Sequence, residues 1–468
     1  MSEAPPGAAA PAPAAAVAGG SADGMGTFLT LWGTQTLSLF GTAITQFGVT
    51  IWLARELYPR AEQRGALALG LSATALAFTA PMIVFAPIAG AFADRHDRRR
   101  ILILADSASF ALTAALVALL AAHALSLGAA VALLAGYSLA ASFHNAAFDS
   151  SIPLVAPTAQ LGRANGMMMS SYALAQLLAP ALAATLIALP GFVRAHGWPL
   201  GWVARFDRGT VFAFAADALT FAIAGIAVAL LSIPRPARPA GHPAQPGPPR
   251  GSLVADVREG FAWIARRRPF LWLIGFGSIA NFMLAPLMLL LPVMVRDHLR
   301  LAAGHGASLE VALATVTTAG GLGAVLGGVA VSVRGVRGGR RPQLMLACIL
   351  GVALGEIAVA FAPSVALAAA ALLLCELPIA PLNAVSATMW QSLTPPHMLA
   401  RAMSTRRFIA QSFYPLGTLV AGWLAVPFEP WIVVAGAGAA LAIVCAVQLA
   451  DPRFSALEDQ MRAAAERG

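Results

Sequence analysis

The chain contains 468 residues, of which 59% are hydrophobic and only 11% are charged. Soluble domains carry roughly 25% charged residues, so this composition excludes a soluble protein and favours a membrane protein. The formal net charge is +9, but the 30 basic residues, all arginine, lie in short segments between long apolar runs. This spacing indicates membrane topology rather than a nucleic-acid-binding surface.

The first 26 residues are rich in Ala, Pro and Gly and contain no basic residue. A signal peptide needs a positive segment followed by a short apolar one, and both are missing here. We therefore expect residues 1–26 to form a disordered cytoplasmic tail.

Twelve apolar runs follow, each about 20 residues or longer, which is the length that a helix needs to cross about 30 Å of hydrocarbon. Several contain Gly or Pro, which neighbouring helices tolerate inside a bundle. We predict an all-α membrane protein with twelve transmembrane helices. The predicted helices cover 27–54, 66–93, 101–122, 126–148, 166–190, 210–233, 270–295, 311–333, 342–362, 365–391, 407–428 and 431–450.

The stretch Pro234–Arg250 contains seven prolines and divides the twelve runs into six and six. Such a segment forms neither helix nor sheet and is typical of a linker. After it, residues 252–268 alternate apolar and charged positions, which predicts an amphipathic helix on the inner membrane surface. The predicted units are an N-terminal bundle (27–233), a linker with this helix (234–269), a C-terminal bundle (270–450) and a cytoplasmic tail (451–468).

The two halves repeat with an offset of 238 residues. Leu161-Gly-Arg163-Ala164 corresponds to Leu399-Ala-Arg401-Ala402, and Gly90 corresponds to Gly328. A repeat of this kind predicts two pseudo-symmetric six-helix halves around a midplane cavity, the architecture of many transporters.

With the N-terminus inside, the cytoplasmic segments hold 22 arginines and the outer segments eight. This difference agrees with the positive-inside rule and predicts that both termini are cytoplasmic. Cys348, Cys375 and Cys445 lie within predicted helices without ligand spacing, so we expect neither a disulfide nor a metal site.

The loop after the second run reads Gly90-Ala-Phe-Ala-Asp94-Arg95-His-Asp-Arg98-Arg99-Arg100. It resembles the G-x-x-x-D-R-x-x-R-R loop of the major facilitator superfamily. Three further segments, Val257–Pro269, Phe214–Phe221 and Ile152–Val155, look like the branch of drug and siderophore exporters that includes enterobactin exporters and macrolide-efflux proteins. The resemblance implies a multi-pass transporter of the bacterial inner membrane that exports a small amphipathic molecule, driven by inward proton flow.

The chain departs from the drug-antiporter pattern in three places. The fifth run reads Leu178-Ala179-Pro180-Ala181, with alanines where antiporters of this kind often carry glycines. The buried arginine of the fourth helix and the acid of the first helix, also frequent there, are missing. Proton antiport is therefore an implication of the branch resemblance and not of an intact signature.

The charged loop is the candidate gate. Within the resembling fold, Asp94 is expected to face the N-terminal end of the eleventh helix, where arginines and the helix dipole would stabilise its carboxylate. Such a contact would favour the state with the inner side closed. The alternative interpretation is that the loop only fixes topology. The candidate gate residues are Gly90, Asp94, Arg95, Arg98, Arg99, Arg406 and Arg407.

Ionisable side chains within the apolar runs are costly, so each is a functional candidate. Glu376, near mid-membrane in the tenth run, is the first candidate for proton coupling, and Asp149 in the fourth is the second. The alternative for Glu376 is a carboxyl group that bridges two helices without a role in the cycle. Asp106 is expected to reach back to the basic loop, and Asp217 and Glu356 are expected to form structural pairs.

Polar side chains in the first, fourth, seventh and tenth runs are candidates for the substrate cavity, because binding pockets combine apolar walls with a few polar groups. The same side chains are also typical of contacts between helices, and both interpretations stay open. The candidates are Gln35, Ser38, Thr42, Gln46, His144, Asn145, Asn281, Asn383 and Trp390.

An importer of a small metabolite is the alternative within the transporter class, because the sequence does not encode the direction of transport. An enzyme is disfavoured, since no His-x-x-x-His, Gly-x-Ser-x-Gly or Cys-x-x-Cys motif occurs, and a sensor would ordinarily carry an extra soluble domain. No nucleotide-binding glycine loop with lysine is present, which disfavours ATP as the energy source. The expected partners are a small-molecule substrate, protons and the lipid bilayer, with no cofactor and no nucleic acid, and we expect a monomer.

Overall fold

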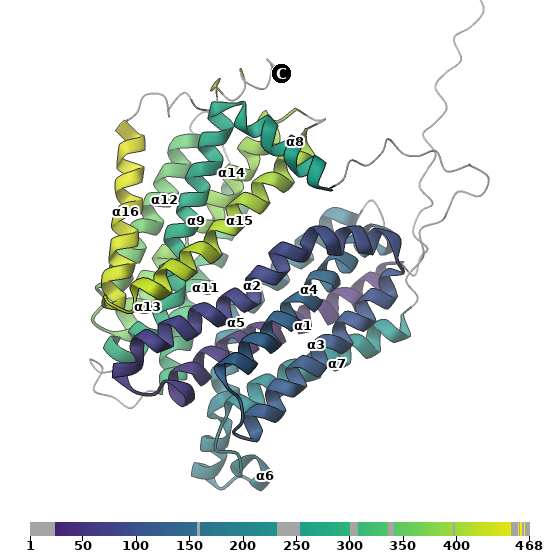
Figure 1. The fold of residues 1–468 in the computed structure, drawn as a ribbon, viewed down its shortest axis with the longest axis vertical. Helices are drawn as coiled ribbons and strands as arrows, with labels where there is room; N and C mark the ends of the chain where they lie inside the picture. The colour runs from purple at the N-terminus through teal and green to yellow at the C-terminus, as the bar shows by residue number, and fades with distance from the viewer. Residues whose placement is uncertain are drawn as a thin grey trace, which may run out of the picture.

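The computed structural model describes residues 24–156, 160–231, 253–299, 308–335, 341–395 and 398–450, with a few positions of the C-terminal tail. The predicted N-terminal tail, except for its last three residues, the proline-rich linker and nearly all of the C-terminal tail lie outside the described residues. The part of the chain that is described consists of helices joined by short turns, with no strand (Figure 1).

The N-terminal half contains six long helices. They are α1 (Gly24–Trp52), which continues into the π-helical turn η1 (Leu53–Leu57), then, after the short turn η2 (Ala61–Gln63), α2 (Arg64–Arg95), α3 (Arg98–Ala121), α4 (Leu127–Val155), α5 (Leu161–His196) and α7 (Thr210–Leu230), with the one-turn helix α6 (Gly201–Ala204) before α7.

The C-terminal half begins with α8 (Leu253–Ala265), the predicted amphipathic helix. The spans that follow are α9 (Arg268–Met294) with the π-helical turn η4 (Val295–Leu299), α11 (Leu309–Arg334), α12 (Arg341–Ala360), the broken pair α13 (Val365–Glu376) and α14 (Ile379–Leu393), α15 (Leu399–Leu424) and α16 (Pro430–Ala450).

Local chemistry sets several of the helix ends. The carboxylate of Asp97 accepts a hydrogen bond from the backbone N–H of Arg99 at 3.0 Å and so caps α3. Ser126 and Ser364 cap α4 and α13 in the same way. At the other end of α5, Gly197 adopts φ 60°, a left-handed conformation that glycine reaches without strain and that commonly ends a helix.

Among the described residues, eleven spans are long and apolar enough to cross a membrane, counting η1, η2 and η4 with the helices they join and α13 with α14. The remaining predicted span, 407–428, corresponds to α15, which is 26 residues long but is less apolar. The prediction placed its start at residue 407, whereas the helix begins at Leu399 and so includes Arg401, Arg406 and Arg407. Long arginine side chains can extend from a helix end toward water, which lets the helix continue beyond its apolar part.

The helices form two bundles (Figure 1). In the N-terminal half α2 packs on α4, and α7 packs on α1 and α3; in the C-terminal half α9 packs on α15, α11 on α13 and α12 on α16. The halves meet mainly where α5 contacts α11 and where α2 contacts α15. Gly321 of α11 permits the first contact, because a Cβ there would lie 2.8 Å from the Cα of Leu177.

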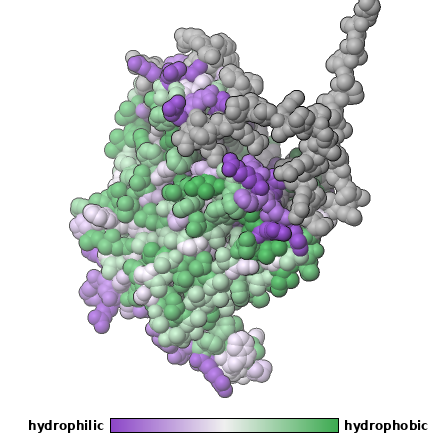
Figure 2. Space-filling model, turned by 45° about the vertical axis from the view of Figure 1, so that its right-hand side comes forward, coloured by the Kyte–Doolittle hydropathy of each residue, from purple (hydrophilic) through white to green (hydrophobic). Residues whose placement is uncertain are grey.

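The face of the molecule seen in Figure 2 is largely hydrophobic (green) along the helices, with hydrophilic residues (purple) gathered toward its ends. Leu104, Ile226, Trp423 and Ile443 are among the large apolar side chains that are exposed. An apolar surface this extensive is unsuited to water, and it is accounted for by contact with lipid tails.

Candidate functional site

Buried apolar side chains form one core at one end of the molecule and two cores at the other. The largest cluster joins both halves, with members such as Trp52 and Leu67 from the first half and Leu290 and Val434 from the second. At the opposite end, one cluster around Leu102 and Phe148 belongs to the N-terminal half, and another around Phe270 and Trp390 belongs to the C-terminal half. We call these two ends the closed rim and the split rim.

Ion pairs join the halves at the closed rim. Arg55 of η1 lies 2.7 Å from Glu310 of α11, whose side chain is only 5% exposed. Arg64 at the start of α2 pairs with Glu429, just before α16. Arg296 of η4 donates a hydrogen bond to the carbonyl oxygen of Tyr58 at 2.6 Å. The sequence analysis did not identify these contacts, although charged residues in such short connections were a usable signal.

Charged groups face each other across the halves at the split rim without being paired. Asp149 of α4 and Arg407 of α15 are both exposed, and each lies within electrostatic range of the other. No ion pair within 4.0 Å joins them. Tyr172 of α5 also lies within electrostatic range of Asp149. Away from the ion pairs of the closed rim, Ser72 of α2 donates a hydrogen bond to the carbonyl oxygen of Thr418 on α15 at 3.1 Å, so polar contacts between the halves continue along these two helices.

The predicted gate residues are distributed over both halves. Asp94 lies 3.9 Å from Arg98, and the Nε of Arg98 donates a hydrogen bond to the hydroxyl of Ser150 on α4 at 2.9 Å. Arg99 donates hydrogen bonds to the carbonyl oxygens of Val228 and Ala229 at the end of α7. The charged loop thus ties α3 to α4 and α7 within the N-terminal half.

The remaining gate residues have other surroundings. Arg406 donates a hydrogen bond to Ser386 of α14 at 3.0 Å and lies over the ring of Trp390. Arg95 is exposed, and a Cβ at Gly90 would meet nothing within 4 Å. A latch between Asp94 and Arg406 or Arg407 stays a prediction for a state in which the split rim is closed.

A polar network lies inside the N-terminal half. His144 of α4 lies between two partners: its Nδ1 is 2.9 Å from Oδ1 of Asp106 on α3, and its Nε2 is 2.6 Å from Oε1 of Gln35 on α1. Asp106 was expected to reach back to the basic loop. The structure instead directs it into the bundle, because a carboxylate one turn or more inside α3 meets α4 rather than the loop.

The other substrate candidates have mixed environments. Thr42 is hydrogen-bonded to Tyr137 at 2.7 Å, Asn145 contacts the sulfur of Met82, and Asn281 donates to the carbonyl oxygen of Ala410 at 3.1 Å. Ser38 and Trp390 are buried, and Trp390 packs against Phe270. Gln46 and Asn383 are exposed.

Glu376 is the last residue of α13, directly before the break at Leu377 and Pro378. A Cβ at Gly320 would lie 3.4 Å from its Cγ, so α11 passes close to it. Glu356 of α12 lies within electrostatic range of it; this residue is 0% exposed, and its oxygens have no hydrogen-bond partner among the described residues. Sequence reasoning did not bring these two acids together, because they lie 20 residues apart on different helices.

Asp217 of α7 packs on α1 at Gly41, where a Cβ would lie 2.5 Å from its Oδ1. Its Oδ1 also accepts a hydrogen bond from Thr220 at 3.4 Å. Both contacts lie within the N-terminal half, and the structural role expected for Asp217 stays a prediction.

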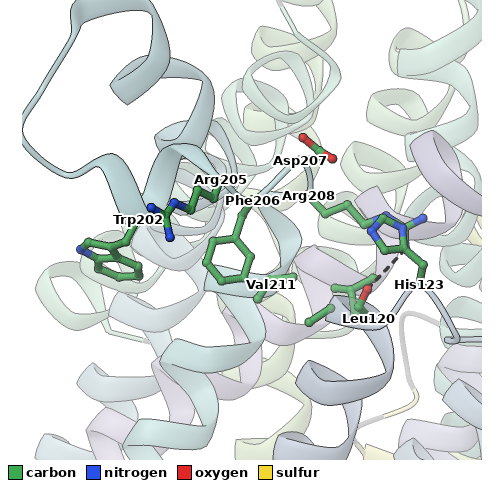
Figure 3. Close-up of a pocket in the computed structure, with 9 residues that line it drawn as sticks. Leu120, His123, Trp202, Arg205, Phe206, Asp207, Arg208 and Val211 are labelled. Atoms are coloured by element: carbon green, nitrogen blue, oxygen red, sulfur yellow. Dashed lines mark hydrogen bonds between the residues drawn. The ribbon is translucent and has the colours of Figure 1, made fainter.

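One surface pocket of about 430 Å³ lies beside the end of α3, near α6 and the start of α7 (Figure 3). Its lining includes His123, Trp202, Arg205 and Arg208, and Arg208 is also paired with Glu56 at 3.0 Å. The pocket lies within the N-terminal half and away from the interface of the halves. Among the described residues, no group of three or more His, Cys, Asp or Glu is placed to hold a metal ion.

Two six-helix halves that share a core at one rim and separate at the other define a membrane transporter built from a repeat. The chain belongs to the Major Facilitator Superfamily, whose sequence profile matches residues 26–336.

Named relatives match the drug-exporter branch of the superfamily. Macrolide efflux protein A of Streptococcus pyogenes is 28% identical over 295 residues, which cover 63% of this chain and 65% of that protein. The multidrug efflux pump Tap of Mycobacterium tuberculosis is 26% identical over 403 residues, covering 83% and 86%. A solved bacterial homologue of the human lysosomal transporter Spinster has a TM-score of 0.62 at 17% identity and covers 96% of both chains, which shows the shared fold.

Proposed function

We propose that this transporter exports a small amphipathic molecule of the drug, macrolide or siderophore class by alternating access, coupled to proton antiport. The observation that carries alternating access is the single core at the closed rim and the two separate cores at the split rim. A molecule in this state exposes its interior toward one side only. The names of the efflux relatives support the direction and the substrate class.

In the second state of the cycle, the contacts at the closed rim must break and new contacts must form at the split rim. The pairs Arg55–Glu310 and Arg64–Glu429 would break, and the charges at the split rim would approach each other. Asp149 and Arg407 are placed for such an approach, with the charged loop around Asp94 beside them. A proton or a substrate shifts this equilibrium only if it binds one state more tightly.

Glu376 is the proposed proton-coupling residue, with Asp149 second. Glu376 lies at the break between α13 and α14, where the backbone is not held in one continuous helix, and ionisable side chains within membrane spans are costly unless they serve a function. The proposed substrate contacts are the polar groups between the halves, foremost Gln46 and Asn383, which are exposed.

The proposed orientation places the split rim, α8 and both termini on the cytoplasmic side of the bacterial inner membrane. The 22 arginines predicted for that side support it. We further propose that the protein acts as a monomer without ATP.

Everted membrane vesicles test this function. Vesicles that contain the protein should accumulate a radiolabelled macrolide or a cationic dye when a proton gradient is imposed, and should lose the gradient faster when the substrate is added. Glu376→Gln should abolish the response to the gradient, whereas Glu62→Gln, at an exposed position of η2, should leave it unchanged. Accumulation in right-side-out vesicles instead would contradict export and favour an importer.

A further inference from the structure

We propose that Asp106, His144 and Gln35 form a second proton-binding site, in the N-terminal half, at which the His144 ring takes up and releases a proton during transport. This inference rests on the proton-coupled export proposed above. The site is separate from Glu376, which belongs to the C-terminal half.

The geometry around His144 suits a doubly protonated ring. Both ring nitrogens face oxygen atoms, at 2.9 Å for Oδ1 of Asp106 and at 2.6 Å for Oε1 of Gln35. A carboxylate and an amide oxygen only accept hydrogen bonds, and only the charged imidazolium carries an N–H group on both nitrogens. The Nδ1–Oδ1 contact lies within ion-pair distance but lacks hydrogen-bond geometry, so it favours a positive charge on the ring, while the Nε2 contact favours an N–H group facing Gln35. A neutral ring would leave one of its nitrogens facing an acceptor.

Gln35 can follow the change in protonation. If His144 loses its Nε2 proton, a half-turn of the Gln35 amide would present an N–H₂ donor to the ring nitrogen. Gln35 belongs to α1, and its neighbour Thr36 is hydrogen-bonded to Ser171 of α5 at 2.8 Å. α5 in turn contacts α11 of the other half. A reorientation of the Gln35 side chain would therefore occur next to a helix that takes part in the contact between the two halves.

The buried carboxylate of Asp106 depends on the proton of the His144 ring. The side chain of Asp106 is 1% exposed, and among the described residues neither of its carboxylate oxygens has a hydrogen-bond partner, so the ion-pair contact with His144 is what compensates its charge. A buried carboxylate with one partner depends on that partner for compensation of its charge. Release of the proton would leave this charge uncompensated, so release must accompany a rearrangement of the helices around it.

The His144 ring is not sealed from solvent. The His144 side chain is 13% exposed, and the exposed Asp149 lies five residues farther along α4, within electrostatic range of His144. Asp149 is therefore placed to pass protons between His144 and the open end of the interface.

Each element packed around the site contributes neighbours. Within the N-terminal half, α7 packs against Asp106 at Gly225, where a Cβ would lie 3.5 Å from the Cβ of Asp106. Met82 of α2 contacts Asn145, the residue after His144. The titratable or charged groups near the site among the described residues are Tyr137 and Asp149 on α4, Asp217 on α7, Tyr172 on α5, Arg407 on α15 and the Asp94–Arg98 pair. His144 itself contacts α3 through Asp106 and α1 through Gln35.

The test uses the purified full chain in proteoliposomes with a transported dye, and it measures gradient-driven transport and substrate exchange without a gradient. His144→Gln should lose the stimulation by the proton gradient, to less than about one tenth of the wild type, and should retain exchange. His196→Gln, at an exposed histidine at the end of α5, is the matched control and should behave as the wild type. Full stimulation of His144→Gln would overturn the inference while leaving the proposed function intact.

A wild type that shows no stimulation at all would refute proton coupling, and with it both proposals. Because replacement of a buried partner can unfold the N-terminal half, Gln35→Glu provides a second measurement. A carboxylate at this position favours the protonated ring, so the pH midpoint of transport should move upward by about one unit or more. An unchanged midpoint in a normally folded Gln35→Glu protein would also overturn the inference.

Discussion

Glu310 illustrates how single residues hold this state together. Its side chain is 5% exposed, and both of its carboxylate oxygens accept hydrogen bonds from Arg55, which is 49% exposed. A pair with one partner in water contributes little to overall stability, since solvent screens it. Its two members belong to different halves, however, so the contact exists only while the closed rim is closed.

We expect Glu310→Gln to shift the equilibrium toward the state with the closed rim open. The loss of one such pair corresponds to about 1 kcal/mol, or roughly a fivefold change in the ratio of the states. Spin labels at Ala61→Cys and Phe428→Cys, in a protein without its three native cysteines, should report a longer distance by pulsed electron resonance.

Glu259→Gln is the matched control for this measurement. It removes the exposed pair with Arg401, which lies within the C-terminal half. The distance distribution across the closed rim should then be that of the parent protein. An identical distribution in Glu310→Gln would show that the Arg55 pair does not hold this rim.

At the scale of elements, α11 depends on its glycines for packing. A Cβ at Gly323 would lie 2.2 Å from the carbonyl oxygen of Leu373, and one at Gly327 would lie 2.0 Å from that of Leu377. Backbone atoms cannot relieve such a clash by a change of rotamer. A larger residue at either position would therefore push α11 away from the end of α13. Gly328 differs, because a Cβ there would meet nothing within 4 Å.

Gly323→Ala should therefore lower the thermal unfolding midpoint of the protein in detergent, through a loss of roughly 1–3 kcal/mol typical of overpacking. Gly328→Ala, in the same helix, should leave the midpoint unchanged or raise it slightly, because Ala favours helix more than Gly does. Intrinsic tryptophan fluorescence on heating measures both. Equal midpoints for the two variants would argue against close packing at Gly323.

The tenth predicted span is divided into two helices in the structure. The apolar run 365–391 predicted one helix, and the structure has α13 and α14 with a break at Leu377 and Pro378. Proline lacks the N–H that a continuous helix needs, so the break had a visible cause. Its consequence, the placement of Glu376 at the break, depends on how α11 and α12 pack around it and could not be predicted from the run itself.

At the scale of the whole molecule, the distribution of the cores determines which movement is possible. One core joins the halves at the closed rim, while each half keeps its own core at the split rim. The proposed rotation of one bundle against the other would therefore leave the packing inside each bundle intact. Motion of this kind is the basis of alternating access in repeat-built transporters.

A disulfide across the closed rim should stop this motion. We expect Arg64→Cys with Glu429→Cys, in a protein without other cysteines, to lose transport on oxidation and to regain it on reduction. Uptake of a dye into everted vesicles measures both conditions. Glu259→Cys with Arg401→Cys joins an ion pair within one half, at 2.9 Å, and should transport equally when oxidised. Unimpaired transport by the oxidised closed-rim pair would refute the rocking movement.

The orientation of the molecule can be checked in intact cells. A membrane-impermeant maleimide should label Arg60→Cys, near the closed rim, and should label Arg266→Cys only after the cells are opened. Both positions lie outside the membrane spans, so each is accessible from water. Labelling of Arg266→Cys in intact cells would reverse the proposed orientation.

The sequence alone determined the helix content, the twelve spans, the division into halves and the superfamily, because burial in lipid requires continuous apolar helices of a fixed length. It also indicated the charged residues that deserve study, since charges are costly within apolar runs. The partners of those residues were decided only by the tertiary structure: Asp106 meets His144, Arg55 meets Glu310, and Glu376 lies beside Glu356. These pairs join helices that are distant in the chain, so they depend on the tilt and rotation of each helix, which the apolar pattern leaves undetermined.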